Sequence, residues 1–356
     1  TPRAQAAPVQ CPAMNPPRLL LHIGTSKTGS TAIQAALHER TRALAEAGVT
    51  DVSQQDWAAA ARAALGRLDQ PDPILIQRTR DALQQQVEHA HRQSRRLLVW
   101  SYEGFAGNSL VGYRNAPRVA EALREITEGL YVTVPVYLRR QDLFLESVYA
   151  QQVFAGSSAS FDAFANRYAA QDFDWHALLA TYADAFGHDA LRPRRYEPAS
   201  LLDDFAEAVG VPLREPGQHP VRNPSCSALG IAALRQSNDQ LDRNQQKRFR
   251  AAIKSLSPKP AGQSLVFFTA AQRRVLIERY ALSNALAAQR FFGTAEGEAL
   301  FAPIEEPLLD AEPSVPDAHA VQRLIDQAQR QSNQPAWRTK LSSLMQRGQR
   351  LSRWDV

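Results

Sequence analysis

Apolar runs and helical patterns alternate along the first two thirds of the chain. Three short runs are almost continuously apolar, as expected of strands buried on both faces of a sheet, and a weaker fourth run follows. These predicted strands cover residues 18–23, 96–101, 131–138 and 190–196. Between the first two, residues 31–48 predict one helix that ends at Gly48. Strands that alternate with helices predict an α/β fold with a mostly parallel central sheet.

Strand signals stop at about residue 199, and the rest of the chain is predicted to be helical. Helices are expected at residues 142–154, 175–186, 199–209, 227–237, 239–255 and 270–292. Pro135 lies in the third predicted strand, and its missing N–H predicts an edge strand, a bulge or an early start. The pattern divides the chain into a disordered arm (1–17), an α/β domain that is helical from about 199 (18–301), a linker rich in proline and acidic residues (302–317) and a basic helical tail (318–356).

Composition and charge narrow the possible function classes only slightly. The chain has 356 residues, of which 44% are apolar, and a net charge of +5. Positively and negatively charged residues are interleaved along the chain, so no nucleic acid is expected as a partner. Local binding sites for anions are compatible with this composition. Cys11 and Cys226 form neither a disulfide framework nor a metal-ligand pattern, which favours a cytoplasmic setting and no metal. The first residues lack the apolar core of a signal peptide, but the chain starts at Thr1 rather than Met, so an upstream targeting segment stays open.

A glycine-rich loop follows the first predicted strand and precedes the first predicted helix. It runs from Gly24 to Thr31, and Gly24 and Gly29 have the G-x-x-x-x-G spacing of phosphate-binding loops. Glycines let backbone N–H groups turn toward one point, and a helix that begins near Ser30 adds the positive end of its dipole. Lys27 adds a positive charge inside the loop. The loop therefore predicts a binding site for a phosphorylated nucleotide.

The position of the lysine distinguishes this loop from that of an ATPase. A Walker A loop has its lysine directly after the second glycine, followed by a Ser or Thr that holds magnesium. Here Ser30 follows Gly29, and Lys27 lies two positions before that glycine. No strand ending in the aspartate of a Walker B motif is evident. The loop thus favours metal-free group transfer from a shorter anionic donor, with a P-loop kinase or NTPase as the alternative.

The string L-H-I-G-T-S-K-T-G-S-T-A-I-Q, residues 21–34, resembles the 5′-phosphosulfate loop of sulfotransferases that use 3′-phosphoadenosine 5′-phosphosulfate (PAPS). It is most similar to their bacterial and carbohydrate-type members. The resemblance covers roughly residues 18–301 and implies a P-loop NTPase-like three-layer fold with a helical C-terminal part. It also implies that Lys27 contacts the bridging oxygen and the transferred sulfuryl group. The other loop residues implied in donor binding are Ser26, Thr28, Gly29, Ser30 and Thr31.

A second motif is similar to the same family. The family places an Arg after a strand and a Ser eight residues later, and both bind the 3′-phosphate; Arg139 and Ser147 have this spacing. Arg139 follows a predicted strand, at the end where α/β proteins bind ligands, although pairing with a nearby carboxylate is an alternative. Tyr196 resembles a residue near the adenine, and Arg222 resembles part of a loop that closes over the nucleotide. A core tyrosine and a simple helix cap stay open as the other interpretations of these two positions.

Sulfuryl transfer to an alcohol needs a base near the acceptor hydroxyl and cations near the leaving phosphate. Glu103, in the segment S-Y-E-G after the second predicted strand, resembles the base of carbohydrate-type sulfotransferases. It is expected at the same sheet edge as the loop, and capping of a following helix is its other interpretation. His22 is the second candidate base, although a histidine inside an apolar strand is more often a hydrogen-bonded core residue.

The acceptor follows from the resemblance alone. A glycan alcohol is favoured as the partner, and lipid, peptide and small-metabolite alcohols stay open. A non-enzymatic module that binds a membrane or a partner through the basic tail is a further alternative. For that tail, packing against the body of the protein is favoured over membrane contact.

Overall fold

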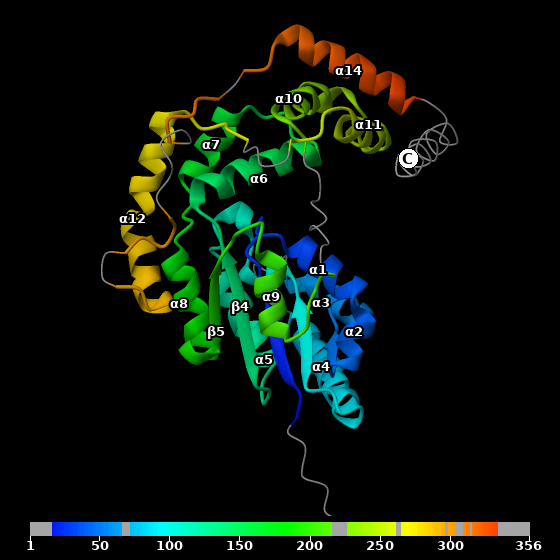
Figure 1. Cartoon of the computed structure of the whole chain (residues 1–356), viewed down its shortest axis with the longest axis vertical. Coiled ribbons are helices and arrows are strands. Elements are labelled where there is room, and N and C mark those ends of the chain that lie inside the picture. The colour runs from blue at the N-terminus through cyan, green and yellow to red at the C-terminus, as the bar shows by residue number, and fades with distance from the viewer. Residues whose placement is uncertain are drawn as a thin grey trace, which may run out of the picture. The chain divides into compact units, whose positions relative to one another are not determined.

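The computed structural model describes residues 16–65, 72–215, 226–260, 265–295, 298–302, 309–313 and 315–333. The chain forms two compact units. The sheet unit comprises Thr1–Arg140, Gln171–Val221 and Tyr280–Pro303, and the helical unit comprises Gln141–Ala170, Arg222–Arg279 and Ile304–Val356. Figure 1 shows the elements of both. The sequence-based division at residues 17, 301 and 317 stays a prediction.

The sheet unit is built around a five-stranded parallel sheet. Its strands are β1 (Arg18–His22), β2 (Val49–Asp51), β3 (Leu97–Ser101), β4 (Val132–Leu138) and β5 (Leu191–Arg195). They lie in the order β2-β3-β1-β4-β5, and every pair of neighbours is parallel. The predicted α/β fold with a parallel central sheet is therefore confirmed. Because β1 is the middle strand, the loop that follows it opens at the centre of one sheet edge.

Helices cover both faces of this sheet. Alternate residues of a strand point to opposite faces, so Val99 and Trp100 of β3 face different layers. Val99 belongs to a core shared with α1 (Ser30–Glu39), α2 (Thr41–Glu46) and α9 (Leu201–Val209). Trp100 meets Trp57 of α3 (Asp56–Leu65), their ring centroids 5.1 Å apart. Next to α3 follow α4 (Pro73–Arg92), α5 (Ala116–Ile126) and α8 (Trp175–Phe186), each packed on the one before.

One predicted helix of the sheet unit is wrong, and one strand was missed. Residues 31–48 form two helices rather than one, separated at Arg40, although Gly48 ends the segment as expected with a left-handed φ of 73°. The three-residue strand β2 directly after Gly48 was not predicted, because three residues are too short to show a period. The four predicted strands are present with slightly shorter bounds.

Pro135 lies in β4, which is an internal strand between β1 and β5, so the expectation of an edge strand is wrong. The ladder between β1 and β4 pairs only Leu19 with Val132 and Leu20 with Thr133, and Pro135 lies beyond it. The Pro135 carbonyl still accepts the Ile23 N–H at 3.3 Å. Pro135 has no N–H to donate toward β1, and the hydrogen bonds on this side are continued by its carbonyl and by Tyr137.

The helical unit contains α6 (Gln141–Ala155), α7 (Phe161–Ala169), α10 (Ala228–Ser237), α11 (Arg243–Leu256) and α14 (Ala318–Ser332). α12 (Ala270–Phe292) begins in this unit and ends in the sheet unit. α14 packs on α10 and α11. α11 begins later than predicted, because Asp242 and Gln245 form a capping box. Short 3₁₀ turns occur at Glu103–Ala106 (η1), Ser109–Val111 (η2), His188–Ala190 (η3) and Asn238–Gln240 (η4).

Several predicted segments lie outside the described residues. These are residues 1–15 of the arm, 303–308 and 314 of the linker, and 334–356 of the tail. Arg222 lies outside them as well. Among the described residues, no helix combines the length and apolarity needed to cross a membrane.

Candidate active site

The loop from Gly24 to Thr31 connects β1 to α1 and is fixed to β4. The Tyr137 N–H donates to the Gly24 carbonyl at 2.6 Å, and the Thr25 N–H donates to the Tyr137 carbonyl at 3.1 Å. The Thr25 hydroxyl donates to the same carbonyl at 3.0 Å, and the Thr28 hydroxyl donates to the Thr25 carbonyl at 2.6 Å. Thr25 and Thr28 are fully buried, so their hydroxyls hold the shape of the loop.

Other donors of the loop are not used inside the protein. Within the described structure, the backbone N–H groups of residues 27–31 donate to no acceptor. α1 begins at Ser30, so the last of these amides belong to the first turn of a helix, where N–H groups have no partner in the helix itself. The Ser30 hydroxyl is also buried without a partner. The buried Ser30 hydroxyl needs a partner from outside the described structure, and the free amides of a helix N-terminus favour an anion.

Both glycines of the loop are favoured by their positive φ, and Gly24 is also required by a close contact with backbone. Gly24 has a φ of 101°, and a Cβ there would come within 2.9 Å of the Glu103 Cα. Gly29 has a φ of 80°, and a Cβ there would come within 2.3 Å of Leu201 Cδ2. Lys27, between them, has a φ of 63° despite its side chain. The loop is therefore tightly folded, and it passes directly over the segment that carries Glu103.

Lys27 lies half-buried between two charged groups. Burial lowers the pKa of Lys27 below its ordinary value, and the positive charge of Arg139 lowers it further, whereas Glu103 raises it. Lys27, Arg139 and Glu103 therefore lie close enough for the charges of Arg139 and Glu103 to shift the pKa of Lys27. A cation in such a partly desolvated place attracts an anionic ligand more strongly than the same cation in water.

Arg139 follows β4 and contacts the loop directly. Its Nη1 donates to the Lys27 carbonyl at 3.1 Å, and its guanidinium lies 5.5 Å from the centroid of the Tyr196 ring. Tyr196 follows β5 and approaches the loop at Gly29, where an added Cβ would lie 3.3 Å from the ring. Both residues predicted from the sequence therefore lie at the loop.

Ser147 lies in the second turn of α6, which begins at Gln141, two residues after Arg139. α6 belongs to the helical unit, whereas Arg139 belongs to the sheet unit. A joint role of Arg139 and Ser147 stays a prediction, as does that of Arg222.

Glu103 and His22 occupy different environments. Glu103 is the first residue of η1, half-buried, and its Oε2 lies 3.5 Å from the Gln34 Nε2. The same Nε2 donates to the Ser101 carbonyl at 3.2 Å. His22 is fully buried, and its Nδ1 lies 2.7 Å from the Ser101 hydroxyl. Its ring packs edge-on against the Phe205 ring, with the centroids 5.3 Å apart. His22 is thus part of the core, while Glu103 is accessible beside the loop.

His22 should make the stability of the protein depend on pH. Burial lowers the pKa of His22 from its ordinary value of 6.5 to about 3. Between these two pH values the unfolded chain binds a proton at His22, whereas the folded chain does not. Stability is therefore expected to fall with falling pH in this window, by about 1.4 kcal/mol per pH unit from this residue. Urea unfolding between pH 5 and 7 should show a smaller slope for His22→Asn than for the wild type. The control is His91→Asn, which removes an exposed imidazole; an equal loss of slope there would contradict the assignment.

Two further residues support the site and were missed from the sequence. Buried Tyr113, with a φ of 59°, accepts the Ser26 N–H on its hydroxyl at 3.2 Å. Gln34 donates to the Ser101 carbonyl and lies within reach of the Glu103 carboxylate, so it helps to position both. Tyr113 and Ser26 are 87 positions apart in the sequence, and Gln34 and Glu103 are 69 positions apart, so no local pattern could reveal these contacts.

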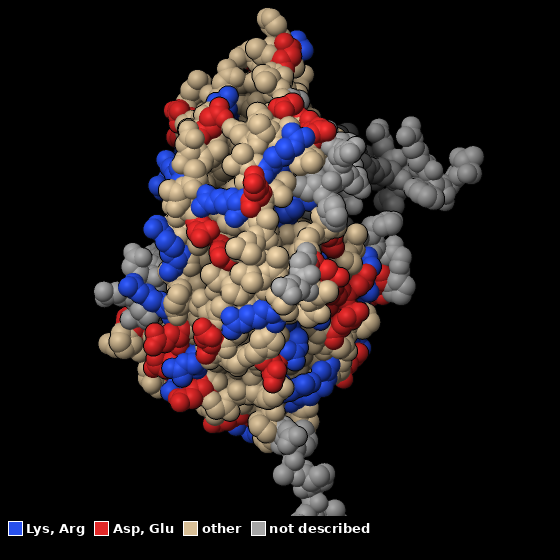
Figure 2. Space-filling view, turned by 90° about the vertical axis from the view of Figure 1, so that its left-hand side faces the viewer, with Lys and Arg blue, Asp and Glu red and all other residues tan. Residues whose placement is uncertain are grey.

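The charge on the surface is mixed. Figure 2 shows Lys and Arg interspersed with Asp and Glu over the face that it presents. Among the residues that the structure describes, no group of three or more His, Cys, Asp or Glu side chains is arranged to hold a metal ion. The described cysteine, Cys226, is buried and free.

Comparison with known proteins gives limited matches. No protein-family model matches the chain. An uncharacterized protein of Archaeoglobus fulgidus is 30% identical over 166 residues, which are 44% of this chain and only 45% of that protein's length. The crystal structure of a sulfotransferase from Alicyclobacillus acidocaldarius aligns with 65% of this chain and 99% of its own, with a TM-score of 0.33 and 11% identity. At this TM-score the likeness carries no weight for function, which must be argued from the residues of the site.

Proposed function

We propose that this chain is a sulfotransferase that moves a sulfuryl group from PAPS to an acceptor hydroxyl. One observation carries the proposal: the amides of residues 27–31 and the buried Ser30 hydroxyl have no acceptor within the described structure. A phosphate with several acceptor oxygens would satisfy them. Lys27 lies before Gly29 rather than after it, which fits a single 5′-phosphate with its sulfuryl group better than the β- and γ-phosphates of ATP.

Each residue of the site has a role in this proposal. The loop amides with Ser26, Thr28, Gly29, Ser30 and Thr31 form the cradle of the 5′-phosphate. Arg139, with Ser147, binds the 3′-phosphate, and the ring of Tyr196 lies at the adenine end. Arg222 closes over the nucleotide. The support for Arg139 and Tyr196 is their contact with the loop and with each other.

Glu103 acts as the base in the proposed reaction. It takes the proton of the acceptor hydroxyl as the acceptor oxygen forms its bond to sulfur, while the bond from sulfur to the 5′-phosphate oxygen breaks. Lys27 and the loop amides stabilise the negative charge that develops on this leaving oxygen. The products are the sulfated acceptor and 3′-phosphoadenosine 5′-phosphate (PAP). No metal ion is part of this scheme.

Glu103→Gln should lower the rate of sulfuryl transfer by about 10²–10⁴-fold, because a general base typically contributes that much. PAP should bind to this variant as tightly as to the wild type. Transfer of label from ³⁵S-PAPS to a panel of glycan, lipid, peptide and small alcohols measures the rate, and calorimetry measures PAP binding. Glu121→Gln on α5 removes an exposed carboxylate and should leave the rate unchanged. If His22→Asn is inactive while Glu103→Gln is active, the base is assigned to the wrong residue.

The rest of the proposal concerns partners and location. A glycan is the favoured acceptor, and the enzyme is placed in the cytoplasm. Magnesium-dependent hydrolysis of ATP would instead support a P-loop kinase or NTPase. Activity that resides entirely in residues 318–356 would support a binding module.

A further inference from the structure

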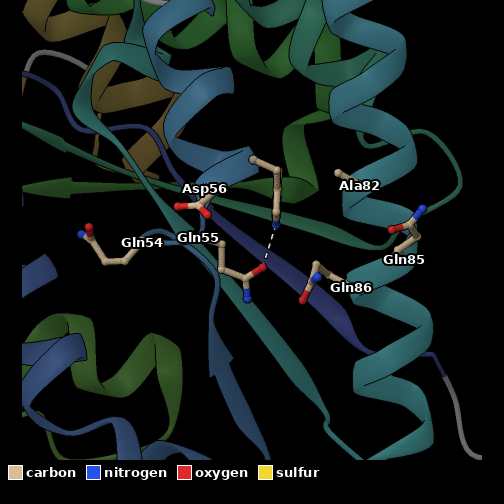
Figure 3. A pocket seen from close by; sticks show the side chains of 7 residues that line it. Gln54, Gln55, Asp56, Ala82, Gln85 and Gln86 are labelled. Carbon is tan, nitrogen blue, oxygen red and sulfur yellow. Dashed lines mark hydrogen bonds between the residues drawn. The ribbon is translucent and has the colours of Figure 1, made fainter.

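A polar pocket of about 570 Å³ lies in the sheet unit between α3 and α4 (Figure 3). The pocket is largely open to solvent. Two groups of residues form it, one from the start of α3 and the turn before it, the other from the middle of α4. The polar and aromatic residues that line it are Gln54, Gln55, Asp56, Trp57, Gln85 and Gln86.

Glutamine amides dominate the lining; Gln54 and Gln85 are exposed and Gln86 is half-buried. Within the described residues, the side-chain amides of Gln54, Gln85 and Gln86 have no hydrogen-bond partner, while Gln55 accepts the Trp57 Nε1–H at 2.7 Å. Each amide offers two donors and a carbonyl acceptor. A ligand that matches them must carry many neutral groups that both donate and accept, as the hydroxyls of a sugar do.

The same lining disfavours other classes of ligand. No Lys or Arg lines the pocket to bind a phosphate or sulfate, and Asp56 would repel an anion. Ala82 is the one aliphatic residue of the lining, so a lipid chain would find little apolar surface. Trp57 is a half-buried aromatic residue of the lining whose ring also contacts Trp100, and aromatic rings of this kind can pack against the C–H face of a sugar.

The pocket is tied to the segment that carries Glu103. The turn after β2 includes Ser53, next to Gln54, and the Ser101 N–H donates to the Ser53 hydroxyl at 2.8 Å. Glu103 follows Ser101 by two residues. Along the sheet edge, the phosphate loop follows β1, Glu103 follows the neighbouring β3, and the pocket follows β2 on the far side of β3. The three features thus lie in a row, with Glu103 between the loop and the pocket.

We propose that this pocket binds an uncharged saccharide unit of the acceptor and so places the neighbouring unit at Glu103. The role in acceptor binding rests on the proposed function; the binding of a saccharide does not. Gln85 and Gln86 of α4 bind the sugar hydroxyls from one side and Gln54 and Asp56 from the other. Trp57 packs against the sugar ring.

The test uses the full chain, with and without saturating PAP, and neutral trisaccharides of glucose, galactose, mannose, xylose or N-acetylglucosamine. Saturation-transfer NMR and calorimetry should detect binding of at least one of them in either condition. Gln86→Leu and the more exposed Gln85→Leu should each weaken this binding at least tenfold. Gln84→Leu, on α4 but outside the pocket, should not. PAP affinity should be the same in all four proteins.

The proposal is overturned if none of the trisaccharides binds. It is also overturned if folded Gln86→Leu and Gln85→Leu both bind the trisaccharide as the wild type does, because the sugar then lies elsewhere. Either result leaves PAP binding, and with it the proposed function, unaffected. Conversely, saccharide binding that depends on Gln85 and Gln86 in a protein that does not bind PAP supports the pocket and contradicts the sulfotransferase assignment.

Discussion

Lys27→Met is expected to lower the rate of sulfuryl transfer by about 10²–10³-fold, the usual loss when a group that stabilises transition-state charge is removed. Lys27 is half-buried beside Arg139 and Glu103, so no water-exposed cation can replace it at the leaving oxygen. Methionine has a similar length and, like lysine, must adopt the positive φ of this position. The loop should therefore keep its fold, and PAP should bind with at most about a tenfold loss, or 1.4 kcal/mol.

The rate is measured with ³⁵S-PAPS and an accepted alcohol, and PAP binding by calorimetry. Lys247→Met, which removes an exposed lysine of α11, is the control for the loss of one positive charge and should retain full activity. Lys27→Arg tests geometry, because guanidinium keeps the charge but not the point-like shape of ammonium. A Lys27→Met enzyme that transfers sulfate at the wild-type rate would remove Lys27 from the mechanism.

Arg273→Met is expected to destabilise the helical unit by about 3–5 kcal/mol, the cost of leaving buried charges without their partner. Arg273 of α12 is fully buried. Its Nη2 donates to Glu146 Oε1 at 3.0 Å, and its Nε lies 3.4 Å from Asp142 Oδ2. The same Glu146 oxygen accepts the N–H groups of Phe267 and Phe268 at 2.8 and 3.1 Å. Without the guanidinium, two buried carboxylates of α6 would face each other.

Urea unfolding of the variant measures this effect. The adjacent Arg274 forms an exposed ion pair with Asp310, so Arg274→Met should cost at most about 1 kcal/mol and is a matched control. Burial already raises the pKa of Glu146, so Glu146→Gln combined with Asp142→Asn should recover part of the stability lost in Arg273→Met. If Arg273→Met is as stable as Arg274→Met, the three buried charges do not hold the helical unit together.

The sequence predicted those parts of the protein that depend on local signals. The loop from Gly24 to Thr31 was recognisable because its glycines, its lysine and its flanking strand and helix are adjacent in the chain. Arg139 and Glu103 were found through the resemblance of their segments to a known family, and both segments follow strands that end at one sheet edge. Helices such as α8 and α12 were predicted with their full bounds, because their apolar periods are long.

Features that depend on distant contacts could not be predicted. Pro135 lies in an internal strand, where its carbonyl and the neighbouring Tyr137 continue the hydrogen bonds toward the segment after β1. Tyr113 and Ser26 are 87 residues apart in the sequence, and Arg273 and Glu146, which form a buried ion pair, are 127 residues apart. The glutamine pocket combines α3 and α4, and single glutamines on a helix carry no signal.

The most direct test of the central claim is the thermal stability of the full chain with nucleotides. If the loop and Arg139 bind a donor with phosphates at both the 5′ and 3′ positions, PAP at about 100 times its dissociation constant should stabilise the fold by about 2.7 kcal/mol. The same concentration of 5′-AMP should stabilise it less, and Arg139→Leu should remove the difference between the two. Stabilisation by ATP with magnesium that exceeds that by PAP, or none by PAP at all, would contradict the account.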